Sequence, residues 1–399
     1  MVDSILSYWE IFFLILSVAL PTCFNMGLIT KYRVLILAAQ KEYIISFIHT
    51  IFYIIGNVIA ILLINNGYSL LVGRVAIMIA LFLNYFFVAV YSRKEFAWIN
   101  YKEKPMHHEI KGTKSVISLK VMSFFYTSAP TLMISTIPET GLLLASVYSV
   151  YKSVITMVKS VLTAVSNAPR LSFGALLAEG NTDKVKQYFQ MYEMIICIME
   201  AVILGVTGLL IFPFVKLYTN GINDISYNNI PLAILLIVTT LLELLHIPSG
   251  QIIQMKGDFK TANKIQIRAL IVLIITMFIG RMFAGIIGIV SSVLIAASML
   301  TVLEIGYVAK NILDRKSNEL IKNIVPCVVI VIVCMLIGMN IDININSYLQ
   351  FIFYGIVFVV CVGICTLLIY SLVDYYIIRK VFEFVISILF KHEKSTDNI

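Results

Sequence analysis

Charged side chains are scarce in this sequence. Asp, Glu, Lys and Arg make up 13% of its 399 residues, against about 25% in soluble domains. Hydrophobic residues make up 60%. So few charges cannot give a folded chain a hydrated surface, and the composition therefore excludes a soluble globular protein.

Motifs of redox, metal and nucleotide chemistry are missing as well. The six cysteines form no Cys-x-x-Cys pair and lie in or beside apolar stretches, as small core residues do. His107 and His108 lie in a basic stretch with no cysteine nearby, which does not favour a metal site. There is no Gly-x4-Gly-Lys-Ser/Thr phosphate loop, so the chain does not hydrolyse ATP itself. We expect no metal, no other cofactor and no enzymatic activity.

Long apolar stretches are what the sequence does contain. Each is close to the roughly 20 helical residues that cross a bilayer, and each is continuously apolar and about twice as long as the alternating strand of a membrane barrel. The sequence therefore predicts an all-α, polytopic transmembrane bundle. The eleven predicted spans are Ile5–Phe24, Tyr43–Ile64, Leu70–Val90, Ser118–Thr136, Gly141–Val165, Gln187–Ile211, Ile230–Gly250, Ala262–Phe283, Gly285–Val308, Ile321–Met339 and Tyr348–Tyr370.

The basic residues lie mostly in alternate gaps between these spans. The gap at 91–117 is the richest, and the gaps at 65–69 and 340–347 carry no Lys or Arg. Positive loops face the cytoplasm, which predicts a cytoplasmic C-terminus in a bacterial inner membrane. The net charge of +8 then reflects topology and contact with anionic lipids, so no nucleic-acid partner is expected.

An internal repeat predicts the domain organisation. Residues 40–43 and 256–259 align at an offset of 216, and the same shift superimposes the spans that follow. Each copy includes the span just before these residues. Three further spans, between residues 118 and 211, precede the later copy and none precedes the earlier one, so we expect that three N-terminal helices are missing from the chain. The predicted parts are a remnant bundle at 1–90, a basic linker at 91–117, a six-helix bundle at 118–309, a final helix pair at 310–370 and an amphipathic cytoplasmic tail at 371–399.

Four segments resemble one known family. They are the turn Leu37–Ile44, the run Ser146–Tyr151, the segment Ser166–Ala178 and Gly257–Lys260. In this order they resemble the polysaccharide repeat-unit flippases (Wzx-like) of the multidrug/oligosaccharidyl-lipid/polysaccharide (MOP) exporter superfamily, which includes the MATE-type exporters. The resemblance implies fourteen helices in two pseudo-symmetric bundles plus a final pair. It also implies that an undecaprenyl-pyrophosphate-linked oligosaccharide is moved across the membrane by alternating access, with glycosyltransferases and a polymerase as possible partners.

Two lysines within one apolar span are the main candidate site. Lys152 and Lys159 are seven residues apart, so they share a helix face with Tyr148. A lysine at mid-membrane costs about 2.5–3.5 kcal/mol on insertion scales, so both are expected to face a wet interior and to bind the pyrophosphate or acidic sugars. Alternatively, Glu193 and Glu200 have the same spacing on the next span and could neutralise them, through pairs Lys152–Glu200 and Lys159–Glu193.

Other charges give further candidates. Arg74 and Arg281 lie near the outer ends of spans and are expected to reach the interface or to form an outer substrate site. Arg170 could attract substrate at the cytoplasmic side or anchor its helix. Glu243 and His246 lie three residues apart and form either a proton-coupling element or a satisfied polar pair.

Two other functions remain possible from the sequence. An ion-coupled exporter of cationic drugs would need unpaired carboxylates, whereas the two lysines favour an anionic cargo. A membrane-bound polysaccharide polymerase would need a sizeable extramembrane region, and the gaps between the spans are short.

Overall fold

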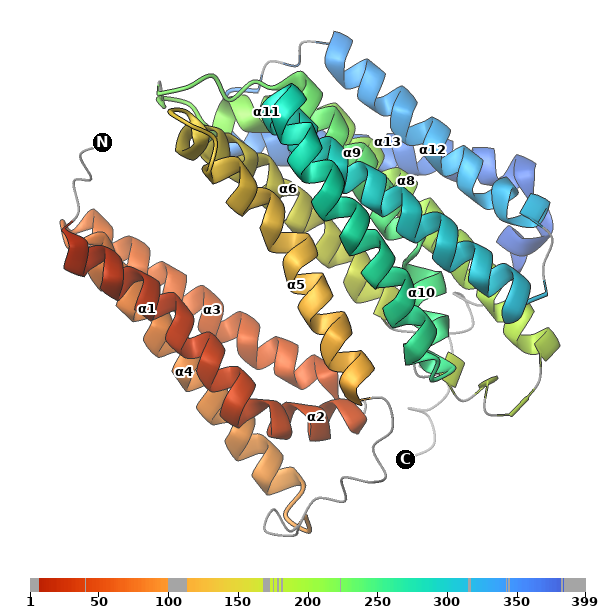
Figure 1. The fold of residues 1–399 in the computed structure, drawn as a ribbon, viewed down its shortest axis with the longest axis horizontal. Coiled ribbons are helices and arrows are strands. Elements are labelled where there is room, and N and C mark those ends of the chain that lie inside the picture. The colour runs from red at the N-terminus through yellow and green to blue at the C-terminus, as the bar shows by residue number, and fades with distance from the viewer. Residues whose placement is uncertain are drawn as a thin grey trace. The chain divides into compact units, whose positions relative to one another are not determined.

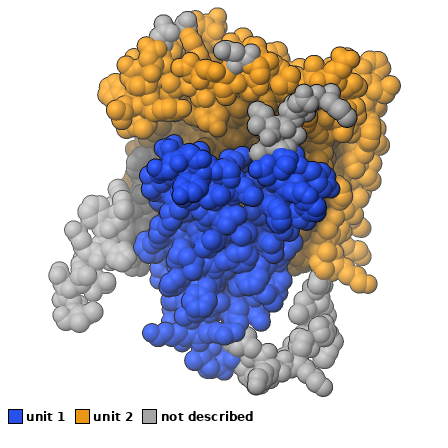
Figure 2. Space-filling model, turned by 90° about the vertical axis from the view of Figure 1, so that its left-hand side faces the viewer, with its two compact units in different colours: residues 1–109 blue, residues 110–399 orange. Residues whose placement is uncertain are grey.

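The chain is all-helical throughout the part that the computed structural model describes. That part comprises residues 7–39, 41–99, 113–167, 173–174, 176–177, 179–180, 182–222, 224–314, 317–341, 343, 345–381 and 383. It divides into two compact units, residues 1–109 and 110–399 (Figure 2). The division falls within the predicted linker at 91–117. Of the predicted tail, only the residues up to 381 and residue 383 are described.

The described part of unit 1 consists of three helical segments. The first comprises α1 (Tyr8–Phe24), a π-helical turn (Asn25–Ile29) and α2 (Thr30–Ala38), which bends away from α1, and the others are α3 (Glu42–Asn65) and α4 (Leu70–Glu95) (Figure 1). A Cβ atom added at Gly56 of α3 would lie 2.7 Å from the Cβ of Ala80 in α4. Small side chains therefore let these two helices approach closely.

Unit 2 contains the remaining helices. They are α5 (Thr113–Ser135), α6 (Gly141–Asn167), α8 (Thr182–Tyr218), α9 (Ile230–Leu245), α10 (Ile247–Met255), α11 (Phe259–Asn311), α12 (Ser317–Asn340) and α13 (Tyr348–Val373). The middle of α8 is the most buried of the apolar helices, with 61% of its 18-residue apolar segment buried. It packs against α12 and α13 as well as α6 and α9.

Within the described ranges, nine helical segments are long and apolar enough to cross a membrane, so the protein is a multi-pass membrane protein. Two features separate this count of nine from the eleven predicted crossings. Two lysines and many hydroxyl side chains interrupt the apolar residues of α5, which is not among the nine. The predicted spans 262–283 and 285–308 together form α11. The count of eleven and the MATE-like bundle remain predictions.

The 53 residues of α11 form a hairpin. Ala284 and Gly285 have non-helical dihedral angles, and Gly285 has φ +52° and ψ −127°, a conformation that only glycine adopts readily. On either side of this tip the two halves meet backbone to backbone, because a Cβ atom at Gly280 would lie 2.4 Å from the carbonyl oxygen of Gly288. Figure 1 shows the two halves as rods that diverge from one end.

A second glycine contact joins α8 to α12. A Cβ atom at Gly338 would lie 2.3 Å from the carbonyl oxygen of Gly208. Small residues of this kind are the usual means of close helix packing in membranes, where no hydrophobic effect drives helices together. The layer formed by α8, α12 and α13 is consequently tight.

Candidate functional site

Helix α6 presents the predicted polar stripe toward its neighbours in unit 2. Tyr148 is 4% exposed, and both lysines are half-buried. The ammonium group of Lys152 lies 5.5 Å from the centre of the Tyr148 ring, within the range of a cation–π contact. The stripe therefore exists as predicted from the spacing, since residues four and seven apart share a helix face.

Lys152 is held by neutral oxygen atoms of α5. Its Nζ donates hydrogen bonds to the backbone oxygen of Thr127 at 2.7 Å and to the hydroxyl of Thr131 at 3.0 Å. No carboxylate pairs with it among the described residues. The positive charge of Lys152 is thus hydrogen-bonded but not neutralised.

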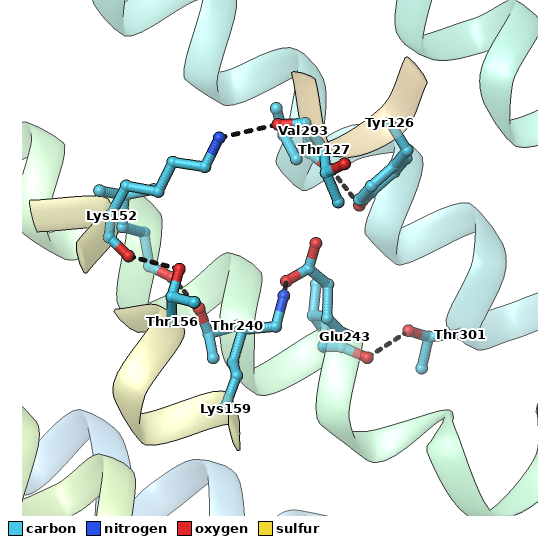
Figure 3. Close-up of polar contacts among 11 residues, drawn as sticks. Tyr126, Thr127, Lys152, Thr156, Lys159, Thr240, Glu243, Val293 and Thr301 are labelled. Carbon is cyan, nitrogen blue, oxygen red and sulfur yellow. Dashed lines mark hydrogen bonds and ion pairs between the residues drawn. The ribbon is translucent and has the colours of Figure 1, made fainter. Parts of the chain in front are cut away.

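Lys159 pairs with Glu243 of α9 (Figure 3). The Glu243 side chain is 13% exposed and that of Lys159 is 34% exposed, so the pair lies at the edge of the packed interior. In Figure 3 the Lys152 ammonium group turns toward α5, whereas that of Lys159 meets the Glu243 carboxylate. The two lysines of one stripe therefore differ in charge compensation.

His246 lies at a helix break one turn beyond Glu243. It caps both the end of α9 and the start of α10, and Pro248 explains the break because proline has no N–H to donate to the carbonyl of Leu244. The His246 Nδ1 lies 2.9 Å from Oε2 of Glu304 in α11. Gly250 makes room for that carboxylate, since a Cβ atom there would lie 2.7 Å from it.

The predicted pairings of these groups were wrong. Lys159 pairs with Glu243 rather than with Glu193, and Lys152 contacts threonines rather than Glu200. Glu243 and His246, expected as one pair, each bind a partner on another helix. The physical reason is that α9 lies against α6 with its Glu243 facing Lys159, whereas the two glutamates of α8 face the layer with α12 and α13.

Glu193 and Glu200 lie in that second layer. The Nδ2 of Asn323 in α12 donates to Glu193 Oε2 at 3.2 Å, and both residues are buried. Glu200 is fully buried, and neither of its carboxyl oxygens has a hydrogen-bond partner in the described part of the chain. These two residues are thus separated from the lysine stripe.

Of the three candidate arginines, the structure describes Arg74 and Arg281. Arg281 donates from Nη2 to the backbone oxygen of Thr136 at 2.6 Å, just beyond the end of α5, so it caps that helix. Arg74 is exposed near the start of α4 in unit 1. Arg170 lies outside the described residues.

Sequence reasoning missed three contributors, Glu304, Thr127 and Thr131. A carboxylate within an apolar helix was a usable signal for Glu304, because such a group is expensive in a membrane unless paired. The threonines gave no comparable signal, since they commonly bond to their own helix. Among the described residues no group of three His, Cys, Asp or Glu side chains could hold a metal ion.

The arrangement can bind an anion at Lys152, and the paired groups Lys159–Glu243 and His246–Glu304 can exchange charge partners. Lys152 offers a free point charge that neutral oxygens orient, as suits reversible binding of a phosphate group. The pairs Lys159–Glu243 and His246–Glu304 join α6, α9 and α11, and the second is an ion pair when His246 is protonated. No family model, curated protein or solved structure matches the chain.

Proposed function

We propose that the chain is a flippase that moves an undecaprenyl-pyrophosphate-linked oligosaccharide from the inner to the outer leaflet of a bacterial cytoplasmic membrane. The substrate would serve the synthesis of O-antigen, capsule or exopolysaccharide, and the C-terminus would be cytoplasmic. The proposal assigns the chain to the repeat-unit flippases of the MOP superfamily. It is supported by the resemblance of the sequence and by a multi-pass helical architecture.

The observation that carries the proposal is the uncompensated charge of Lys152. Three neutral groups surround its ammonium group, namely the Thr127 carbonyl, the Thr131 hydroxyl and the Tyr148 ring. A cation that lacks a carboxylate partner in an apolar helix is costly unless an anion or water reaches it. A pyrophosphate headgroup would supply that anion, and alternating access would let Lys152 bind it from one side and release it to the other.

An ion-coupled exporter of small cations is the main alternative. Such a protein needs a carboxylate that is free to bind its cargo. Glu243 and Glu304, the carboxylates near the lysine stripe, already bind Lys159 and His246. This pairing favours the anionic cargo over the cationic one.

Transport in proteoliposomes tests the proposal. The wild type should move a fluorescent polyprenyl-pyrophosphate oligosaccharide between leaflets, and Lys152→Gln should slow this by about 10–100-fold, the loss of one charge-assisted hydrogen bond. Lys152→Arg should retain part of the rate because it keeps the charge. Lys264→Gln, which removes an exposed lysine from α11, serves as the matched control.

The competing results are equally specific. Equal rates for wild type and Lys152→Gln would remove Lys152 from the substrate path. Failure to move the lipid, together with efflux of a cationic dye that is lost in Glu243→Gln, would support the exporter instead. An increase in oligosaccharide chain length would indicate a polymerase.

A further inference from the structure

The carboxyl group of Glu200 is an unusual feature of the second polar layer. Its residue is 0% exposed, and both side-chain oxygens are buried without a hydrogen-bond partner in the described part of the chain. By contrast, the carboxyl groups of Glu243 and Glu304 each meet a basic side chain. In the described structure, therefore, the carboxyl group of Glu200 is dry and has no neighbouring group that would balance a negative charge.

Contacts above and below Glu200 fix its position between three helices. One turn later, the space at Gly205 is bounded by Cys334 Sγ of α12 at 3.2 Å and Val362 Cγ1 of α13 at 3.3 Å. Two turns earlier, Glu193 binds Asn323 of α12. Tyr370 of α13 donates to the backbone oxygen of the same Asn323 at 2.6 Å. Glu200 thus lies at the centre of the α8–α12–α13 layer.

The groups that face Glu200 cannot neutralise it. Cys327 of α12 and Tyr370 of α13 lie within electrostatic range of Glu200, and Cys197 lies one turn earlier on α8. On α6, which packs against α8, Lys159 pairs with Glu243 of α9, and the Lys152 ammonium group donates to Thr127 and Thr131 of α5. Among the described residues, therefore, no cation contacts the Glu200 carboxyl group.

An ionised carboxylate buried without a cation or hydrogen bonds costs many kcal/mol, and such a group takes up a proton instead. We propose that Glu200 is a proton-binding site, and that its uncharged, protonated form lets α12 and α13 pack against α8. When the proton leaves, the charge requires water, and the close contact of Gly208 with Gly338 must loosen to admit it. Protonation of Glu200 would then control how closely α8 packs against α12 and α13, whatever the protein carries.

Infrared spectroscopy of the purified full chain tests for the proton. An ordinary glutamate has a pKa of about 4.3 and gives no protonated-carboxyl band at neutral pH. We expect such a band at pH ~7 in the wild type, its loss in Glu200→Gln and its retention in Glu243→Gln, the matched control. Absence of any protonated-carboxyl band from the wild type overturns the proposal without recourse to a variant.

Labelling of Cys334 tests the consequence. This thiol lies on α12 beside Gly205 and is 8% exposed, and it can be followed by peptide mass spectrometry after reaction with a neutral maleimide. Raising the pH should accelerate its labelling in the wild type at least several-fold more than in Glu200→Gln, which cannot lose a proton. Equal acceleration in both chains, or opening that follows sodium concentration instead of pH, overturns the proposal. Neither readout involves transport, so these results are independent of the flippase assignment.

Discussion

The two compact units differ in how far their most buried helices are enclosed. The buried share of the most apolar segment reaches 28% in α4 of unit 1 and 61% in α8 of unit 2. Among the described residues, unit 1 carries the ion pair Lys41–Glu95 at helix ends, while unit 2 carries Lys159, Glu243 and Glu304 within its helices. A rod surrounded by lipid cannot hold such groups, because only neighbouring protein or water can compensate them. The polar groups on which the proposed function depends belong to unit 2.

The units also differ in which atoms limit the approach of the two helices in a hairpin. At Gly56 in the α3–α4 hairpin of unit 1 the nearest atom belongs to the side chain of Ala80, and at Gly280 in the α11 hairpin of unit 2 it belongs to the backbone of Gly288. A side chain can be shortened by substitution, but a backbone contact cannot. A second substitution can therefore make room for a methyl group at the helix contact of unit 1 but not at that of unit 2.

Alanine at the two hairpin contacts should give the largest difference between the units. We expect Gly280→Ala to cost about 3 kcal/mol, the upper end for overpacking, because its new methyl group meets a carbonyl. Gly56→Ala should cost about 1 kcal/mol and should be rescued by Ala80→Gly. Thermal unfolding in detergent measures both.

Gly306→Ala is the control for the hairpin pair, since nothing lies within 4 Å of a Cβ atom added there. The comparison fails if Gly280→Ala is no less stable than this control. It also fails if Ala80→Gly leaves the Gly56→Ala defect unchanged.

The ion pairs should give the next largest difference. Glu243→Leu leaves Lys159 without its carboxylate, and we expect a loss of about 1–2 kcal/mol, because the lysine is partly exposed and can turn to water. The double variant with Lys159→Met should recover most of this loss. Glu95→Leu, which frees the exposed Lys41 in unit 1, should change the unfolding temperature very little. A double-mutant cycle checks the coupling, and a coupling near zero for Lys159 and Glu243 would contradict it.

The smallest expected difference concerns two equivalent turns of the internal repeat. In unit 2, Asp258 caps α11 by accepting from the Thr261 N–H at 3.1 Å, and it also accepts from the Tyr307 hydroxyl at 2.6 Å. In unit 1, α3 begins after Lys41 with no side-chain cap, and Glu42 is the counterpart of Asp258. Asp258→Ala should cost about 1 kcal/mol, as other caps do, and Glu42→Ala much less.

This cap should depend on pH. The Tyr307 hydrogen bond, followed by the bond from Thr261, lowers the pKa of Asp258 below its ordinary value of 3.8. A lowered folded-state pKa stabilises the protein above the unfolded value, and that contribution disappears as pH falls through the folded value. The stability gap between wild type and Asp258→Ala should therefore be constant near neutral pH and shrink below about pH 4. In Tyr307→Phe the pKa of Asp258 in the folded protein should lie closer to its ordinary value, so the shrinkage should be smaller and should end at a higher pH. An unchanged pH profile would argue against the hydroxyl.

The sequence predicted the helices well because apolar length is a local property. The spans placed at 43–64, 70–90 and 348–370 lie within α3, α4 and α13. The offset of 216 residues in the sequence also relates the α3–α4 pair to the two halves of α11. The predicted spans 262–283 and 285–308 meet at the tip of α11, but hydropathy does not predict the backbone conformation of Ala284 and Gly285.

The charge partners were the part that the sequence could not provide. Depth along a helix predicted Lys159 and Glu193 at one level, but depth does not specify which helix packs on which face. Glu243 reaches Lys159 because α9 packs on α6, a choice made by shape complementarity over many apolar side chains. The break at His246 redirected its ring toward Glu304 in the same way.

The two-residue tip of α11 has a consequence for biosynthesis. A connection consisting of Ala284 and Gly285 is too short for one half to be anchored in the bilayer while the other waits outside. Both halves must leave the translocon as a single inserting hairpin. Met282 and Phe283, which are 83% and 87% exposed, would lead it into the lipid.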